Sequence, residues 1–174
     1  MKKLILSTAA LAITASMSFA DGHSVVRMGT EGAYPPYNFI NDAGEVDGFE
    51  RELGDALCVL ADLTCEWVKN DWDSIIPNLV SSNYATIMAG MSITDERKEV
   101  IAFTQNYYPP TASAYVAASE EADLEGGVVA GQTATIQAGY VAESGATLIE
   151  FATPEETVAA VRNGDADAVF ADKD

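Results

Sequence analysis

Short apolar runs bounded by turn residues alternate along this chain with longer stretches in which apolar residues recur every three or four positions. The short runs are typical of buried strands and the longer stretches of amphipathic helices. The expected strands are residues 25–29, 65–68, 84–88, 112–117, 127–131, 147–152 and 166–171. The expected helices are residues 48–63, 72–80, 95–101, 136–143 and 154–163. Strands that alternate with helices predict parallel sheets in an α/β fold.

Several residues sharpen the expected helix boundaries. Thr153, Pro154 and Glu156 form a strong helix start, with a capping hydroxyl, proline at the first position and an acid three residues after the cap. Pro77 lies inside the helix expected over residues 72–80, so we expect that helix to bend there. The helix expected over residues 48–63 carries one apolar face, formed by Phe49, Leu53, Leu57 and Leu60.

The pair Pro109-Pro110 interrupts the pattern near the middle of the chain. A proline pair cannot continue a helix or a central strand, so it indicates a boundary. We therefore expect two lobes. The first spans residues 21–110, and the second begins at residue 111.

Residues 1–20 have the features of an export signal. Lys2 and Lys3 form a charged start, an apolar run follows, and Ser18-Phe19-Ala20 is a typical cleavage site. The apolar run is short and is interrupted by Ser and Thr, which argues against a permanent membrane span. The sequence therefore predicts export to the periplasm with cleavage after Ala20 and no direct membrane insertion.

Charge and cysteine content narrow the function further. A net charge of −18 argues against nucleic acid or anionic lipid as partners. Cys58 and Cys65 are the two cysteines of an exported chain, which favours a disulfide; two buried free thiols are the alternative. With a single histidine, His23, the cysteines cannot complete a tetrahedral metal shell, so no metal is expected.

Residues 89–97 are the most informative stretch of the chain. An apolar strand runs into this turn, and a helix is expected to leave it at Thr94. The turn thus brings together free backbone N–H groups, a hydroxyl and the guanidinium of Arg97. Helix N-termini favour anions and arginine can grip both oxygens of a carboxylate, so the stretch predicts a carboxylate site.

Five motifs follow one another along the chain: Gly29-Thr30-Glu31 with Tyr34-Pro35-Pro36-Tyr37, Gly48-Phe49-Glu50, Asp71-Trp72-Asp73-Ser74-Ile75-Ile76-Pro77, residues 89–97, and Asn163-Gly164-Asp165-Ala166-Asp167-Ala168. Their order and spacing resemble those of the periplasmic polar amino-acid-binding proteins, which are solute-binding subunits of ABC importers (solute-binding protein family 3). The resemblance implies a two-lobed periplasmic-binding-protein fold of type II, a monomer, an L-amino acid held between the lobes, a membrane permease as partner, and no cofactor.

Family members usually continue well beyond the last of these motifs, whereas this chain stops at Asp174. The resemblance therefore implies that residues 111–174 hold a hinge strand and part of a second lobe, as in an N-terminal fragment of a longer binding protein. The Cys58 and Cys65 pair also resembles the disulfide of the branch that binds basic amino acids.

The resemblance assigns the charged ends of the ligand. Arg97 would bind the carboxylate, helped by Gly90, Met91 and Ser92; the alternative is a surface ion pair with Asp95 or Glu96. Asp172, at the C-terminal edge of an apolar strand, would bind the ammonium, and a solvated acid is the alternative. Thr135 would complete the carboxylate grip or serve as an ordinary helix cap.

The resemblance also assigns the rest of the pocket. Tyr34 and Trp72 would form aromatic walls around the ligand side chain, by apolar or cation–π contact; ordinary core packing is the alternative. Glu31 would face the far end of the ligand, which favours a basic or polar amino acid.

Two other functions stay open. Some relatives with this fold are periplasmic dehydratases that act on prephenate-like cyclohexadienyl or arogenate substrates. Such an enzyme needs a general acid or base, and Glu31 is the obvious candidate. The third function is the extracellular sensor domain of a larger receptor. We expect a binding protein rather than an enzyme.

Overall fold

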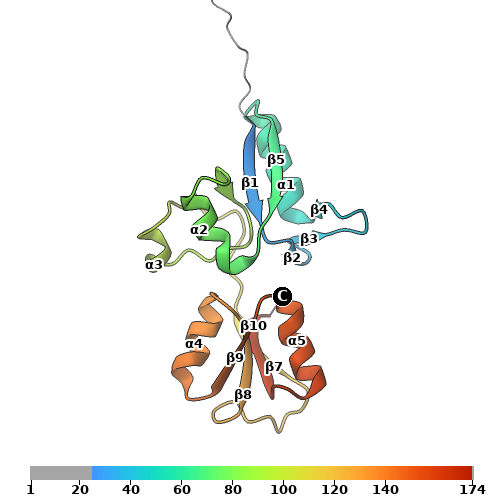
Figure 1. Cartoon of the computed structure of the whole chain (residues 1–174), viewed down its shortest axis with the longest axis vertical. Coiled ribbons are helices and arrows are strands. Elements are labelled where there is room, and N and C mark those ends of the chain that lie inside the picture. The colour runs from blue at the N-terminus through green and yellow to red at the C-terminus, as the bar shows by residue number, and fades with distance from the viewer. Residues whose placement is uncertain (1–24, 174) are drawn as a thin grey trace, which may run out of the picture.

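The computed structural model describes residues 25–173 and folds them into two α/β lobes joined by an extended segment (Figure 1). The predicted export signal, residues 1–20, lies outside the described residues. Between residues 25 and 173 no helix is long and apolar enough to cross a membrane.

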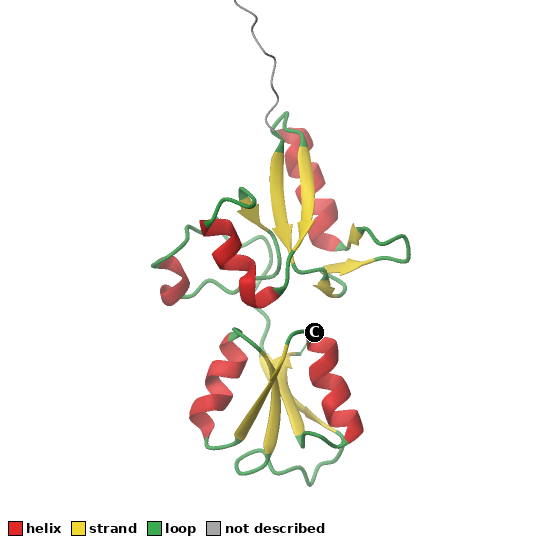
Figure 2. Ribbon diagram, in the orientation of Figure 1, coloured by secondary structure: helices red, strands yellow, loops and turns green. Residues whose placement is uncertain are grey.

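The first lobe is built on a parallel sheet of three strands in the order β5–β1–β6. A small antiparallel sheet, β2–β3–β4, lies beside it and precedes the long helix α1 (Figure 2). The strands are β1 (Val26–Thr30), β2 (Ala33–Tyr34), β3 (Asn38–Ile40), β4 (Val46–Asp47), β5 (Cys65–Lys69) and β6 (Thr86–Ile87). The helices are α1 (Phe49–Leu60), the 3₁₀ turn η1 (Trp72–Ser74), α2 (Ile75–Val80) and α3 (Asp95–Lys98).

The second lobe is a four-stranded sheet in the order β7–β10–β8–β9, with one helix on each side (Figure 2). Strands β10, β8 and β9 are parallel, and β7 pairs antiparallel with β10. Small side chains, Ala130, Ala160, Ala166 and Val169, let α5 pack closely on the sheet. The elements are β7 (Ser113–Ala117), β8 (Val128–Gln132), α4 (Ile136–Ser144), β9 (Thr147–Phe151), α5 (Pro154–Asn163) and β10 (Ala168–Asp172).

Two local predictions are confirmed. Helix α5 begins with the complete capping box, in which Thr153 accepts from the Glu156 N–H and the Glu156 side chain accepts from the Thr153 N–H. Cys58 and Cys65 form a disulfide that links the end of α1 to the start of β5. The bond closes the turn that brings helix α1 back onto the sheet.

The inward face of α1 differs from the apolar face that periodicity indicated. Leu57 and Leu60 are 49% and 83% exposed, whereas Glu50, Gly54 and Cys58 are the buried positions. Gly54 is the reason for this rotation, because a Cβ there would lie 2.5 Å from Trp67 and a bare backbone lets the helix approach β5. Glycine, a disulfide cysteine and a hydrogen-bonded acid therefore form the buried face, and of the predicted leucines Leu53 packs half-buried against the core.

One small sheet was missed, and two helix expectations were wrong. The antiparallel sheet β2–β3–β4 was not predicted, because strands of two or three residues are too short for a periodic signal. The helix expected over residues 72–80 is a 3₁₀ turn followed by α2, which places Pro77 in the first helical turn, where its missing N–H has no helical partner. The helix expected over residues 95–101 ends at Lys98.

Candidate functional site

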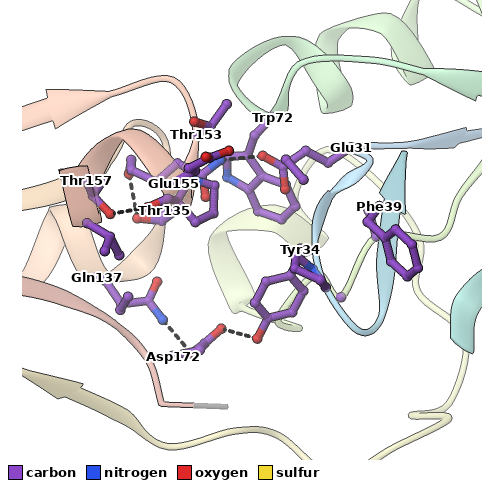
Figure 3. A pocket seen from close by; sticks show the side chains of 18 of the residues that line it. Glu31, Tyr34, Phe39, Trp72, Thr135, Gln137, Thr153, Glu155, Thr157 and Asp172 are labelled. Atoms are coloured by element: carbon purple, nitrogen blue, oxygen red, sulfur yellow. Dashed lines mark hydrogen bonds between the residues drawn. The ribbon is translucent and has the colours of Figure 1, made fainter. Parts of the chain in front are cut away.

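A cleft of about 760 Å³ lies between the two lobes and is lined by side chains from both (Figure 3). Eight of the nine site residues expected from the sequence line it: Glu31, Tyr34, Trp72, Gly90, Ser92, Arg97, Thr135 and Asp172. Met91 does not; it packs on the cluster of Ile75, Tyr84 and Ala89 and lines a smaller neighbouring pocket.

Arg97 is held in position by backbone carbonyls from both lobes. Its Nη1 donates to the Ser92 carbonyl at 2.9 Å, and its Nη2 donates to the Ala134 carbonyl at 3.4 Å. The guanidinium lies over the Trp72 ring, 5.6 Å from its centroid. Desolvation lowers the pKa of Arg97 without threatening its charge, because arginine stays protonated far above neutral pH.

The surface alternative for Arg97 does not occur. Among the described residues Arg97 forms no salt bridge, and its neighbour Lys98 pairs with Asp95 at 3.0 Å. The Thr94 hydroxyl accepts from the Arg97 N–H at 3.2 Å and so caps the short helix α3. The capped helix start therefore aims a charged, carboxylate-free guanidinium into the cleft.

The turn before Arg97 depends on glycine. Gly90 has φ of +62°, and a Cβ there would lie 2.7 Å from the Tyr108 hydroxyl. Its N–H donates to the Glu50 carboxylate at 2.7 Å, so Gly90 lines the cleft but its N–H points away from a ligand. Any contribution of this turn to an anion site would therefore come from the groups after Gly90.

Asp172 ends β10 at the opposite lobe's edge of the cleft. Gln137 Nε2 donates to its Oδ1 at 2.7 Å, and the Tyr34 hydroxyl donates to its Oδ2 at 3.2 Å (Figure 3). Burial, followed by the charge of Asp172, raises the pKa of the Tyr34 phenol, which keeps that hydroxyl a donor. Asp172 is therefore a fixed carboxylate facing the same cleft as Arg97.

Glu31 is the buried acid of the cleft, with 5% of its surface exposed. Gln132 Nε2 donates to its Oε1 at 2.5 Å and also to the Ala152 carbonyl at 3.0 Å. Desolvation raises the pKa of Glu31 to about 7, against the opposing effects of Gln132 and Lys69. In Figure 3, Glu31 lies beside Trp72, whereas Asp172 lies on the far side of Tyr34. The two acids therefore occupy separate places in one cleft.

Thr135 serves as a helix cap, which is one of the two roles that the sequence left open. Its hydroxyl accepts from the Ala138 N–H at 3.1 Å and so caps α4, and it also lines the cleft. The preceding residue, Ala134, has φ of +57°, which turns its carbonyl toward lobe 1 to accept from both Trp72 and Arg97.

Sequence reasoning missed Gln132 and Gln137. Gln132 is the last residue of β8, so the rule that selected Asp172, a polar residue at the end of a parallel strand, also applies to it. Gln137 gives no such signal, because a glutamine in the first turn of a helix is usually exposed, whereas here it is 7% exposed.

The arrangement has the parts of a site for a zwitterion, and comparison with known proteins decides the family. Residues 26–171 match the family model of the bacterial extracellular solute-binding proteins, family 3. The chain belongs to this family. The two α/β lobes accordingly form the periplasmic-binding-protein fold that the motifs implied.

Three relatives illustrate the family. A periplasmic His/Glu/Gln/Arg/opine family-binding protein from Silicibacter pomeroyi, solved in complex with lysine, is 84% identical with a TM-score of 0.82, over 85% of this chain and 67% of that one. The L-arginine-binding protein of Pseudomonas aeruginosa is 34% identical over 99% of this chain and 70% of its own length. An ancestral amino acid-binding protein, described as a precursor of cyclohexadienyl dehydratase, is 29% identical with a TM-score of 0.79, over 86% and 73% of the two chains.

Proposed function

We propose that this protein is the periplasmic solute-binding subunit of an ABC importer and that it captures a cationic L-amino acid, lysine or arginine, for a membrane permease. The observation that carries the proposal is a cleft in which Arg97 pairs with no carboxylate between residues 25 and 173, while Glu31 and Asp172 face the cleft as acids. A ligand with one carboxylate and two separated cationic groups is the complement of that charge pattern. The lysine complex of the 84% identical relative and the arginine-binding relative support this ligand class.

Each group of the ligand has a partner of matching chemistry. The α-carboxylate would displace the long Arg97 contact to Ala134 and take a two-pronged, charge-assisted interaction. The α-ammonium would bind Asp172, whose orientation is fixed by Gln137. The side-chain cation would reach Glu31, replacing the Gln132 amide as its donor.

Closure of the two lobes would report ligand capture to the permease. Between residues that the structure describes, hydrogen bonds already cross the cleft, and they join Tyr34 to Asp172, Trp72 and Arg97 to Ala134, and Gln132 to Glu31. A ligand that contacts both lobes at these points favours the closed arrangement by its differential affinity. The function is therefore binding with a conformational readout and no chemical step.

Thermal unfolding with a panel of L-amino acids tests the proposal, after unfolding and refolding of the protein to remove bound ligand. Ligand binding adds RT ln(1 + [L]/Kd) to stability, which is about 2.7 kcal/mol at 100 times Kd. We expect L-lysine or L-arginine to raise Tm and L-aspartate and D-lysine to leave it unchanged. Equal shifts with acidic and basic amino acids would refute the ligand class, and no shift with any of them would refute the function.

A dehydratase of cyclohexadienyl substrates is a second candidate. The observation in its favour is Glu31, whose pKa of about 7 suits a general acid or base, together with the ancestral relative described as a dehydratase precursor. Incubation with prephenate or arogenate separates the two functions. We expect no phenylpyruvate or phenylalanine to form; product formation that Glu31→Gln abolishes would favour the enzyme.

A further inference from the structure

A second buried acid, Glu50, lies behind the cleft and does not line it. Its side chain is fully buried in the first turn of α1. Among the residues that the structure describes it forms no salt bridge, and neutral donors hold it instead. Asn38 Nδ2 donates at 2.6 Å to one oxygen, while the Gly90 N–H at 2.7 Å and the Tyr107 hydroxyl donate to the other.

The three donors belong to three different parts of the first lobe. Gly90 begins the turn that carries Ser92 and Arg97. Asn38 lies in β3, and its own Oδ1 accepts from the Gly32 N–H at 2.7 Å, directly beside Glu31. Tyr107 lies in the segment that leads out of the first lobe toward β7. One carboxylate therefore connects the Arg97 end of the cleft, the Glu31 end and the interlobe segment.

The backbone around Glu50 is built to place this carboxylate. Gly48 has φ of +112°, and a Cβ there would lie 2.6 Å from the Tyr37 carbonyl, so the start of α1 can press against the β2–β3 loop only with glycine at this position. The Glu50 N–H then donates to the Tyr37 carbonyl at 2.8 Å. At the first turn of α1 the helix dipole also favours a negative charge.

We propose that Glu50 is a positioning residue of the binding site, which sets the separation between the carboxylate-binding turn and Glu31 and ties both to the interlobe segment. The choice of L-lysine as the test ligand rests on the proposed function, whereas the geometric role of Glu50 does not. The role needs a carboxylate, because the donors around this side chain approach both of its oxygens. A glutamine side chain has only one acceptor oxygen. Glutamine would leave either Asn38 or the Gly90 and Tyr107 pair facing an NH₂ group, which donates and cannot accept.

The main test compares Glu50→Gln with Glu52→Gln, a matched control. Glu52 is an exposed acid in the same first turn of α1, so its replacement changes the same charge on the same helix. Calorimetric titration with L-lysine should show a loss of roughly 10- to 100-fold in affinity for Glu50→Gln, the effect of one lost charged hydrogen bond, and less than twofold for Glu52→Gln. Equal affinities of the two variants would overturn the proposal.

Amide NMR of the ligand-free protein separates positioning from general destabilisation. In Glu50→Gln the Gly90 amide proton should move upfield and lose protection from hydrogen exchange, while the amides of β1 keep theirs. Uniform loss of protection across β1 and Gly90 would mean that Glu50 only supports folding, which would overturn the positioning role. This measurement needs no ligand, so it stands even where the lysine titration of the wild type fails.

A second variant covers the case in which Glu50→Gln does not fold. Tyr107→Phe removes a hydroxyl from a side chain that is 39% exposed and leaves the Glu50 oxygen to Gly90 alone. The Gly90 amide proton should then move downfield, opposite to its shift in Glu50→Gln, as its hydrogen bond shortens. An unchanged Gly90 resonance in Tyr107→Phe would contradict the shared acceptor on which the proposal depends.

Discussion

Replacement of Arg97 by alanine should abolish amino-acid binding while leaving the fold intact. In the free protein the guanidinium contributes one good hydrogen bond to Ser92, one long bond of 3.4 Å to Ala134 and a contact with Trp72. Their loss should cost on the order of 1 kcal/mol of folding stability. In the complex the same change leaves a ligand carboxylate buried without a partner, which costs about 3 kcal/mol or more. The predicted loss of affinity is therefore about 100-fold at least.

Calorimetric titration with L-lysine measures this loss, and Lys98→Ala is the matched control. Lys98 lies on the same short helix, but its cation is exposed and pairs with Asp95 at 3.0 Å, so its removal should change the affinity less than twofold. Arg97→Lys should recover only part of the binding, because an ammonium lacks the planar fork that meets two oxygens. Affinity within threefold of wild type in Arg97→Ala would refute the assignment of the carboxylate site.

Four further predictions concern other residues of the molecule. Raising the pH from 6 to 8 should tighten L-lysine binding about tenfold, because the Glu31 pKa of about 7 means that its carboxylate forms over this range. Calorimetry at both pH values measures the change, and Glu31→Gln should remove the pH dependence. In the ligand-free protein the same raised pKa should make the free energy of unfolding fall as the pH rises from 4.5 to about 7, because Glu31 keeps its proton to higher pH in the folded state than in the unfolded state. Urea denaturation across that pH range measures the fall. Reduction of the Cys58–Cys65 disulfide, whose sequence separation is 7, should lower the free energy of unfolding by roughly 2 kcal/mol, measured by urea denaturation with and without reductant. Asp172→Asn should weaken L-lysine binding about 100-fold in a titration, and a loss below threefold would remove Asp172 from the ammonium site.

Much of the fold follows from the sequence because strand and helix periods differ and because the helix starts carry local signals. The capping box at Thr153 and the cap at Thr94 were placed correctly from a few residues each. The buried face of α1 was not predicted correctly, because a search for apolar periodicity favours leucine over glycine and glutamate. A glycine that permits close packing on Trp67 and an acid satisfied by three donors are long-range facts that a local pattern does not contain.

The candidate site divides in the same way. Arg97 and Asp172 were found because a helix start and a parallel strand end are places where the backbone itself favours ligands. Gln137 and Glu50 escaped because their roles depend on partners far along the chain, Asp172 for one and Gly90 for the other. Residues that line the cleft at such places are thus easier to predict than the residues that orient them.

A crystal structure of the protein grown with L-lysine tests the central claim most directly. The account predicts one lysine between the lobes, with its α-carboxylate on Arg97, its α-ammonium on Asp172 and its side-chain ammonium within hydrogen-bonding distance of Glu31. A lysine bound in the reverse direction, or outside the cleft that these three residues line, would contradict it.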